Sequence, residues 1–344
     1  MLRILLDRRI PWGREAFADL GEVHEYDVLS PRELGAAEVL VFRSSTRIDA
    51  DLLAQAPNLQ VLATPVIGLD HIDMQVLDAH RARTGRPLPL FHAPGSTAGG
   101  VADFALAAIC HLAQAMDRDP KSLTVGIVGY GNCGRALAWR LDRMGMRHLA
   151  YDPPLQAREP HAFSSASFEE VLRCDAVSLH VPLTTPSESP WPTWRMFNEQ
   201  VLSACPPMLV NTARGAVIDP EALMKAIDSG RIVAALDVWE GEPEPEADLV
   251  QRAALATPHV AGSVIEGRMR AVAMVREAVC AALRLQAPPW KPEVEPPRSF
   301  TIADIGIAAL SDRFKSAYLS VPPQGRGAVF EAVRASAMRH EVPW

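Results

Sequence analysis

Residues 123–134 read Leu-Thr-Val-Gly-Ile-Val-Gly-Tyr-Gly-Asn-Cys-Gly and are the strongest indication of the fold. Its β-branched residues predict a buried parallel strand, which breaks into Gly129, Gly131 and Gly134 before a helix-forming run up to Met144. In a dinucleotide-binding turn the first glycine permits the bend, the second admits a pyrophosphate, and the third lets helix and strand pack closely. The stretch therefore predicts strand, turn and helix, with phosphates bound at the helix N-terminus.

The neighbouring residues extend this prediction to a specific cofactor. Asn132 and Cys133 lie between Gly131 and Gly134, just before the predicted helix, and we expect them to bind the dinucleotide together with the glycines. A second apolar segment, His148 to Tyr151, ends in Asp152. A carboxylate at the tip of the second strand accepts both ribose hydroxyls and repels a 2′-phosphate. The pattern predicts NAD rather than NADP.

Composition bounds the class of protein. The 344 residues allow two or three domains, and 48% hydrophobic with 22% charged residues is ordinary for a globular protein. A net charge of −7 without a lysine-arginine run argues against a nucleic-acid partner. No apolar run suits a signal peptide or reaches the roughly 18 residues of a membrane span, so we expect a cytoplasmic protein without a membrane partner.

The cysteines indicate a reducing compartment. They are widely spaced and form no CxxC pair: Cys110, Cys133, Cys174, Cys205 and Cys280. Buried thiols are the ordinary interpretation of such a pattern, and we expect no metal site.

Strands and helices alternate along most of the chain, which is typical of parallel sheets. Strands are predicted at 3–7, 23–26, 39–42, 60–64, 88–92, 123–128, 148–151, 176–181, 208–213, 232–238 and 254–260. Helices are predicted at 11–20, 49–56, 73–83, 98–116, 135–144, 263–285 and 328–339. The predicted fold class is α/β, with two doubly wound parallel-sheet domains, one flavodoxin-like and one Rossmann, and a short C-terminal segment.

The order of these elements predicts the domain boundaries. The first, substrate-binding domain would be discontinuous, with residues 1–95 and 267–287, because the helix at 263–285 suits a return crossing. The NAD-binding domain would span 96–266, including the apolar helix at 98–116. Residues 288–344 begin with a proline-rich linker and are too few for an independent core, so we expect a short lobe for interaction or dimerisation.

Three polar residues fall at consecutive predicted strand ends of the Rossmann domain, where ligands bind in open parallel sheets. They are Arg214, Glu242 and His259. Each alone has an ordinary interpretation, as a surface ion pair, a solvated loop acid and a core histidine. As a set beside a dinucleotide fold, a cation, a carboxylate and an imidazole indicate an active site.

The segments around these residues carry a family resemblance. Residues 214–219, 237–243 and 257–262 resemble the signature blocks of the D-isomer-specific 2-hydroxyacid dehydrogenases, and the similarity covers about residues 1–285. The resemblance implies NAD-dependent oxidation of a 2-hydroxy acid, with His259 as acid/base, Glu242 holding its other nitrogen and Arg214 binding the substrate carboxylate.

The same resemblance implies roles for further residues. Asp237 would contact the nicotinamide end and Gly262 the cofactor's edge. The remaining expected cofactor contacts are His180, Pro182 and Thr212, and the expected substrate contacts are Ser44, Val66 and Ser263.

Within the family, residues 152–154 and 239–244 are similar to members that act on 4-phospho-D-erythronate in vitamin B6 synthesis. Arg43 and Arg47 are candidates for a phosphate clamp, although a solvated loop pair explains them equally well. Val66 and Leu69 replace hydroxyl residues of those members, so an unphosphorylated D-2-hydroxy acid is the alternative substrate. An alternative of another class is a dinucleotide-sensing protein with vestigial activity. We expect a homodimer that pairs through the helix at 98–116.

Overall fold

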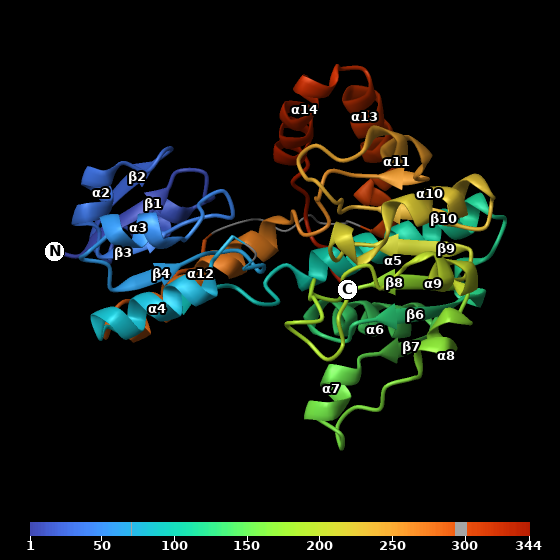
Figure 1. Cartoon of the computed structure of the whole chain (residues 1–344), viewed down its shortest axis with the longest axis horizontal. Coiled ribbons are helices and arrows are strands. Elements are labelled where there is room, and N and C mark those ends of the chain that lie inside the picture. Colours follow the sequence, from blue (N-terminus) through green and yellow to red (C-terminus); the bar gives the residue numbers. More distant parts are fainter. Residues whose placement is uncertain (70, 293–300) are drawn as a thin grey trace. The chain divides into compact units, whose positions relative to one another are not determined.

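The structure, a computed structural model, describes residues 1–69, 71–292 and 301–344 and divides into two compact units (Figure 1). The first unit holds Met1–Thr97 and the stretch that begins at Ile265; the second holds Ala98–Val264 and the C-terminal residues. Each unit has one parallel sheet, which confirms the predicted α/β class with two doubly wound sheets. Part of the predicted proline-rich linker, 293–300, lies outside the described residues.

The first unit has a five-stranded sheet in the order β2-β1-β3-β4-β5, the flavodoxin-like order. Its strands are β1 (Arg3–Asp7), β2 (Glu22–Tyr26), β3 (Val39–Val41), β4 (Val61–Ala63) and β5 (Leu90–Phe91). Its helices are α1 (Gly13–Phe17), α2 (Pro31–Ala36), α3 (Ala50–Gln55), α4 (Met74–Thr84) and α12 (Ile265–Leu283). Helix α2 was not predicted, because six residues capped by Ser30 are too short to show a helical period.

Alternation along the strands gives this sheet two apolar faces. Leu5 and Leu40 point to one cluster, while Ile4 and Leu6 point to the other. The second cluster also contains apolar residues of α12, including Val275. Helix α12 therefore packs on one face of the sheet that the N-terminal residues form. The crossing back that the sequence predicted for 263–285 is therefore present within the unit.

The second unit has a six-stranded parallel sheet in the order β11-β10-β9-β8-β6-β7. Its strands are β6 (Thr124–Val128), β7 (Arg147–Tyr151), β8 (Ala176–Leu179), β9 (Met208–Asn211), β10 (Val233–Leu236) and β11 (Leu255–Ala256). The strand order reverses beside β6, because β7 lies on one side of it and β8 on the other. Such a reversal opens a crevice at the carboxyl ends of the strands, and the glycine turn follows β6 at that place.

Short and long helices cover this sheet. They are α5 (Ala98–Ala115), η1 (Pro120–Ser122), α6 (Asn132–Met144), α7 (Pro153–Arg158), α8 (Phe168–Leu172), α9 (Glu199–Ala204), η2 (Gly215–Val217), α10 (Pro220–Asp228), α11 (Ala247–Arg252), η3 (Ile302–Ile305), α13 (Ile307–Leu319) and α14 (Pro323–Ser336). Most connections place their helix between consecutive parallel strands, as doubly wound sheets require.

Helix α5 differs from the prediction that no run could span a membrane. By length and composition it is apolar enough to do so. However, 13 of its 18 residues are buried within the protein, where it packs on α6 and β9. A buried core helix can be as long and as apolar as a membrane-spanning helix, and the burial of α5 identifies it as a core helix.

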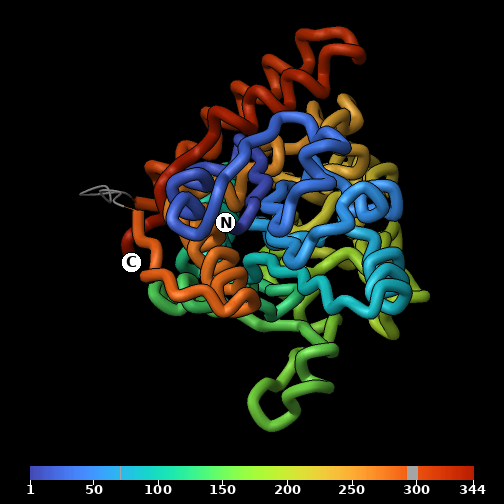
Figure 2. The backbone as a smooth tube through the Cα atoms, turned by 90° about the vertical axis from the view of Figure 1, so that its left-hand side faces the viewer, coloured from blue at the N-terminus to red at the C-terminus, as the bar shows by residue number. Residues whose placement is uncertain are grey.

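The C-terminal residues pack on the second unit instead of standing apart from it. Phe314 and Phe330, from α13 and α14, are fully buried in a core cluster of this unit. Figure 2 shows the two red helices beside the gold segment that holds α11, as Figure 1 does from another side. Ser311 of α13 is also bonded to the sheet, since its buried Oγ accepts the Ala256 N–H at 2.9 Å. The domain boundaries predicted from the sequence stay a prediction, because compact units alone do not test independent folding.

Candidate active site

The glycine turn after β6 has the geometry of a dinucleotide cradle. Gly129 has a positive φ of 93°, which favours glycine. A Cβ on Gly134 would lie 2.0 Å from the Gly129 carbonyl oxygen, so only glycine fits there. A Cβ on Gly131 would meet nothing within 4 Å, which leaves open space in front of the turn. Asn132 and Cys133 begin α6, so their N–H groups have no partner within the helix, and their expected contact with the phosphates stays a prediction.

Asp152 lies at the end of β7, beside the turn. One carboxylate oxygen accepts the Tyr130 N–H at 2.7 Å, and the other accepts the Leu155 N–H at 2.8 Å and caps α7. These bonds fix the carboxylate against the glycine turn. Each oxygen can accept a further hydrogen bond, as ribose hydroxyls require.

His180 follows β8 on the same edge of the sheet. Its ring contacts Ser178 Oγ at 2.9 Å and Thr212 Oγ1 at 3.5 Å, so two of the expected cofactor residues lie together. Burial lowers the pKa of His180 to about 4, so its imidazole is neutral at physiological pH. Pro182 accepts a hydrogen bond from Thr193 through its carbonyl, which ties down the loop that follows. His180 is therefore held in place by two hydroxyl groups, and its expected contact with the cofactor stays a prediction.

The two residues expected to form a dyad are in contact. His259 Nδ1 lies 2.7 Å from Glu242 Oε2, and the other oxygen of Glu242 accepts the Trp239 N–H at 2.8 Å. Burial raises the pKa of Glu242, but the hydrogen bond and charge of His259 and the Trp239 N–H outweigh it and leave this pKa below its ordinary value. The lowered pKa favours the ionised carboxylate, which orients the imidazole through Nδ1. The contact with Glu242 does not occupy the other ring nitrogen, Nε2.

The backbone of His259 adopts an unusual conformation. Its φ is 54°, in the left-handed region that few residues other than glycine adopt. It follows β11, which ends at Ala256 and is shorter than the strand predicted at 254–260. The His259 N–H donates to the Asp237 carbonyl at 2.7 Å, which holds the strained residue in place.

Asp237 supports the same loop with its side chain. It is 1% exposed, and its carboxylate accepts N–H groups from Val260 and Ala261 at 2.8 and 2.9 Å and the Thr257 hydroxyl at 2.7 Å. Burial raises the pKa of Asp237, while the charge of His259 and these hydrogen bonds oppose the rise. Its expected contact with nicotinamide stays a prediction. Gly262 lies farther along this loop, and its carbonyl accepts the Val264 N–H at 2.9 Å.

Arg214 is positioned by residues that the sequence prediction did not single out. Asn211 accepts the Ala213 N–H and donates to the Arg214 carbonyl at 2.9 Å, which shapes the turn after β9. A Cβ on Gly215 would lie 1.9 Å from the Trp239 carbonyl carbon. Glycine at 215 therefore lets the Arg214 turn approach the segment that leads to Glu242. The neighbouring glycine was visible in the sequence, but its contact partner was not.

The three expected substrate residues are divided between the units. Ser44 and Val66 belong to the first unit, where Ser44 is exposed after β3 and the Val66 carbonyl accepts the Ala93 N–H. Ser263 belongs to the second unit and is 6% exposed. Arg43 and Arg47 lie beside Ser44 in the first unit. Substrate contact by these residues stays a prediction. Among the described residues, no three His, Cys, Asp or Glu are grouped to hold a metal ion.

Comparison with known families gives a match at the glycine turn and dyad. The family model described as D-isomer specific 2-hydroxyacid dehydrogenase, NAD binding domain, matches residues 110–261. The erythronate-4-phosphate dehydrogenase of Aeromonas salmonicida (strain A449) is 37% identical over 294 residues, which cover 82% of this chain and 75% of that protein. The enzyme of the same name from Shewanella sediminis (strain HAW-EB3) is 39% identical over 293 residues, covering 83% and 73%.

Solved structures agree on the fold. A protein from Thermus thermophilus has a TM-score of 0.67 and 31% identity, with 84% of this chain and 99% of that chain covered. The D-lactate dehydrogenase of Aquifex aeolicus, complexed with NAD and lactic acid, has a TM-score of 0.65 and 24% identity, with 83% and 96% covered. The second likeness shows the fold alone.

Proposed function

This chain belongs to the D-isomer-specific 2-hydroxyacid dehydrogenase family and is an NAD-dependent enzyme, and on that premise we propose that it oxidises 4-phospho-D-erythronate to the 2-oxo acid. The observation that carries the proposal is the similarity, at 37% and 39% identity over more than four fifths of the chain, to relatives named erythronate-4-phosphate dehydrogenase. This reaction would place the enzyme in vitamin B6 synthesis, as the sequence prediction had it.

The second unit contains the groups that the oxidation needs. His259 Nε2 takes the proton of the substrate hydroxyl, while Nδ1 donates to Glu242, whose charge stabilises the resulting imidazolium. Arg214 binds the substrate carboxylate through its forked guanidinium. NAD, when bound at the glycine turn, supplies the hydride acceptor. The dyad at 2.7 Å favours turnover over a vestigial dinucleotide sensor.

His259→Ala tests this assignment. Removing a positioned acid/base costs about 10²- to 10⁴-fold in kcat. The affinity for NAD, measured by fluorescence titration, should stay near that of the wild type because the glycine turn and Asp152 are untouched. A variant that keeps wild-type kcat would rule out His259 as the acid/base.

The phosphate of the proposed substrate needs cations, and the candidates predicted from the sequence belong to the first unit. Arg43 and Arg47 bracket the segment after β3, and Arg9 reaches the same segment by donating to Ser45 Oγ at 3.1 Å. Arg9 was not among the residues singled out from the sequence. Its ion pair with Asp7 is local, whereas its contact with Ser45 joins residues that only the fold brings together. Val66 favours the runner-up, an unphosphorylated D-2-hydroxy acid, because an apolar side chain there offers no hydroxyl to a polar tail.

The ratio of kcat/KM for 4-phosphoerythronate to that for erythronate separates the two candidates. We expect a large ratio in the wild type and a smaller one in Arg43→Ala and Arg47→Ala. A wild-type ratio near one would end the phosphate proposal. A large ratio that neither variant changes would place the phosphate contacts elsewhere, and Arg9→Ala would then be measured in the same way.

A cytoplasmic homodimer completes the proposal. All five cysteines are free, and burial raises the pKa of Cys133 to about 11, which suits inert thiols of a reducing compartment. The burial of α5 accounts for its hydrophobicity, so dimerisation no longer follows from that feature. Exposed Trp191 and Trp194 on the second unit support it instead. Light scattering that gives a monomer mass at micromolar concentration would reject the dimer.

A further inference from the structure

Arg339, near the end of the chain, contacts the loop that follows His259. Its Nη1 donates to the Val260 carbonyl at 2.9 Å, and its Nη2 donates to the Ala261 carbonyl at 2.6 Å and the Gly100 carbonyl at 2.8 Å. Its backbone N–H donates to the Ser263 carbonyl at 3.1 Å. The residue therefore holds four backbone carbonyls, three of which lie within four residues of His259.

Asp237 holds the opposite edge of the same loop. Val260 and Ala261 donate their N–H groups to its carboxylate and give their carbonyls to Arg339. The loop thus lies between a buried anion and a largely buried cation, with the peptide dipoles aligned from one to the other. Burial lowers the pKa of Arg339, while the charge of Asp237 opposes this fall. Removing either charge would leave the other without its compensation across the loop.

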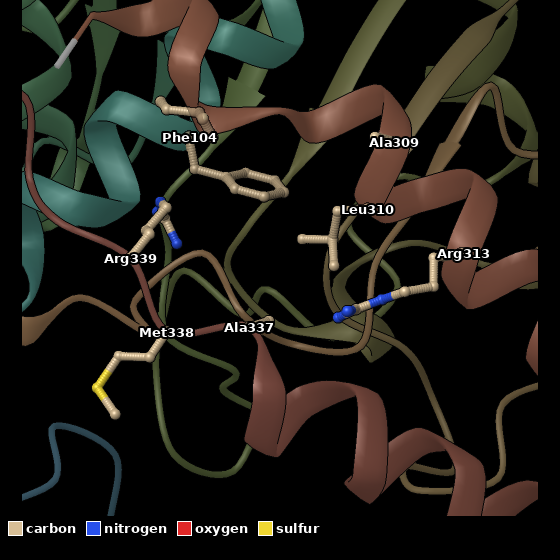
Figure 3. Close-up of a pocket in the computed structure, with 8 residues that line it drawn as sticks. Phe104, Ala309, Leu310, Arg313, Ala337, Met338 and Arg339 are labelled. Carbon is tan, nitrogen blue, oxygen red and sulfur yellow. The ribbon is translucent and has the colours of Figure 1, made fainter.

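The segment that carries Arg339 is itself fixed. Figure 3 shows Arg339 beside Phe104 of α5, next to a cavity of about 300 Å³ that α13 and this segment also line. The guanidinium stacks on Phe104 at 5.5 Å, and its Nε is shielded from solvent. Farther along, Val342 N–H and the Trp344 indole donate to Asp103 at 3.0 and 2.9 Å. The tail is anchored beyond Arg339, so this side chain is a rigid support.

We propose that Arg339 is a positioning residue for His259. By fixing residues 260–263 on the carbonyl side, while Asp237 fixes them on the amide side, it keeps His259 in its left-handed conformation and aims the imidazole at the substrate. A misplacement of about 1 Å in a catalytic group costs up to about 10²-fold in rate, so a side chain that touches neither substrate nor NAD controls turnover. This inference rests on the proposed role of His259.

The test compares Arg339→Met with Lys315→Met in the full-length enzyme. Lys315, on α13, also donates to a backbone carbonyl of the second unit, that of Ala253, but lies on another loop. We expect both variants to lose thermal stability. Only Arg339→Met should lower kcat, by about 10- to 10²-fold, while KM for NAD stays close to the wild type. Arg339→Lys should recover stability but little of the kcat, because an ammonium lacks the planar fork that spans two carbonyls.

Rates are measured well below the unfolding temperature of every variant. Equal kcat in Arg339→Met and Lys315→Met would overturn the proposal. If Arg339→Met does not fold, wild-type kcat in Arg339→Lys would overturn it equally. His259→Ala, measured in parallel, distinguishes the failure of the two proposals. Wild-type kcat in His259→Ala would reject the role of His259 as acid/base. A large loss of kcat in His259→Ala together with wild-type kcat in Arg339→Met would reject only the positioning role of Arg339.

Discussion

Glu242 is subject to opposing influences that a substitution can separate. Its pKa is lowered because the contact with His259 and the Trp239 N–H outweigh burial. Ionised Glu242 therefore stabilises the fold above its unfolded-state pKa, and this contribution is lost as the pH falls through the lower folded-state value. Above that value the carboxylate stays charged and keeps its contact with His259 Nδ1.

Glu242→Gln keeps the shape of the residue and removes that charge. Imidazolium loses its counter-charge, so the limb of the kcat/KM profile that reports His259 should move to lower pH, and kcat should fall because imidazolium forms during oxidation. The measurement is the pH dependence of kcat/KM in both proteins. Superimposable profiles would remove Glu242 from the dyad.

Substitution of Asp152 tests which residue makes the enzyme prefer NAD over NADP. Asp152→Ala removes ribose hydrogen bonds and the repulsion of a 2′-phosphate together, so the preference for NAD over NADP should narrow. The readout is the ratio of kcat/KM for the two cofactors. The variant also loses the cap of α7 and the Tyr130 contact, so Asp152→Asn, whose amide oxygen can accept one of these two N–H groups, is the nearest control. Equal preference in wild type and both variants would place NAD selection elsewhere.

At the scale of elements, the strand, glycine turn and helix around 123–144 could be predicted from sequence because their determinants are local. Apolar runs mark the strands, and glycine spacing marks the turn. The strand predicted at 254–260 covers only Leu255–Ala256. The left-handed conformation of His259 could not be predicted, because its N–H donates to Asp237, which lies at a different strand end. The support by Arg339 was invisible for the same reason, since it joins residues that only the fold brings together.

Two alanine substitutions in the glycine turn should separate binding from folding. Gly131→Ala has room for its Cβ and a backbone φ of −75°, so the free energy of unfolding should change little. The new methyl group occupies the space that a pyrophosphate needs, and KM for NAD should rise by about tenfold or more, equivalent to about 1.4 kcal/mol. Gly134→Ala should instead destabilise the protein, because its Cβ would overlap the Gly129 carbonyl. An unchanged KM for NAD in Gly131→Ala would mean that the pyrophosphate does not bind at this turn.

At the scale of the whole molecule, alternating strands and helices were enough to predict two parallel sheets and the return of α12 to the first. The same rule predicts that Arg214, Glu242 and His259 lie at one edge, since all three follow strands of one parallel sheet, and the contact between Glu242 and His259 agrees with it. The C-terminal residues were expected to form a lobe because about 45 residues cannot build a core alone. In the structure Phe314 and Phe330 of this segment are buried in a core cluster of the second unit, which agrees with a segment too short for a core of its own.

This packing gives the last prediction, Phe314→Ala in the full-length chain. Phe314 is fully buried and lies 6.5 Å from the Trp239 ring and 5.2 Å from the Tyr318 ring, centroid to centroid. If the C-terminal helices belong to the core that supports Glu242 and His259, replacing the Phe314 side chain by alanine should lower the free energy of unfolding by about 3–5 kcal/mol. Denaturant unfolding followed by tryptophan fluorescence measures this, and Met338→Ala, at a residue 41% exposed, is the control expected to change little. Dehydrogenase activity measured along the same denaturant series shows whether the transition that moved is the one that inactivates the enzyme. A midpoint of activity loss that Phe314→Ala leaves unchanged would mean that the C-terminal helices are an appendage after all, and that the dyad stands without them.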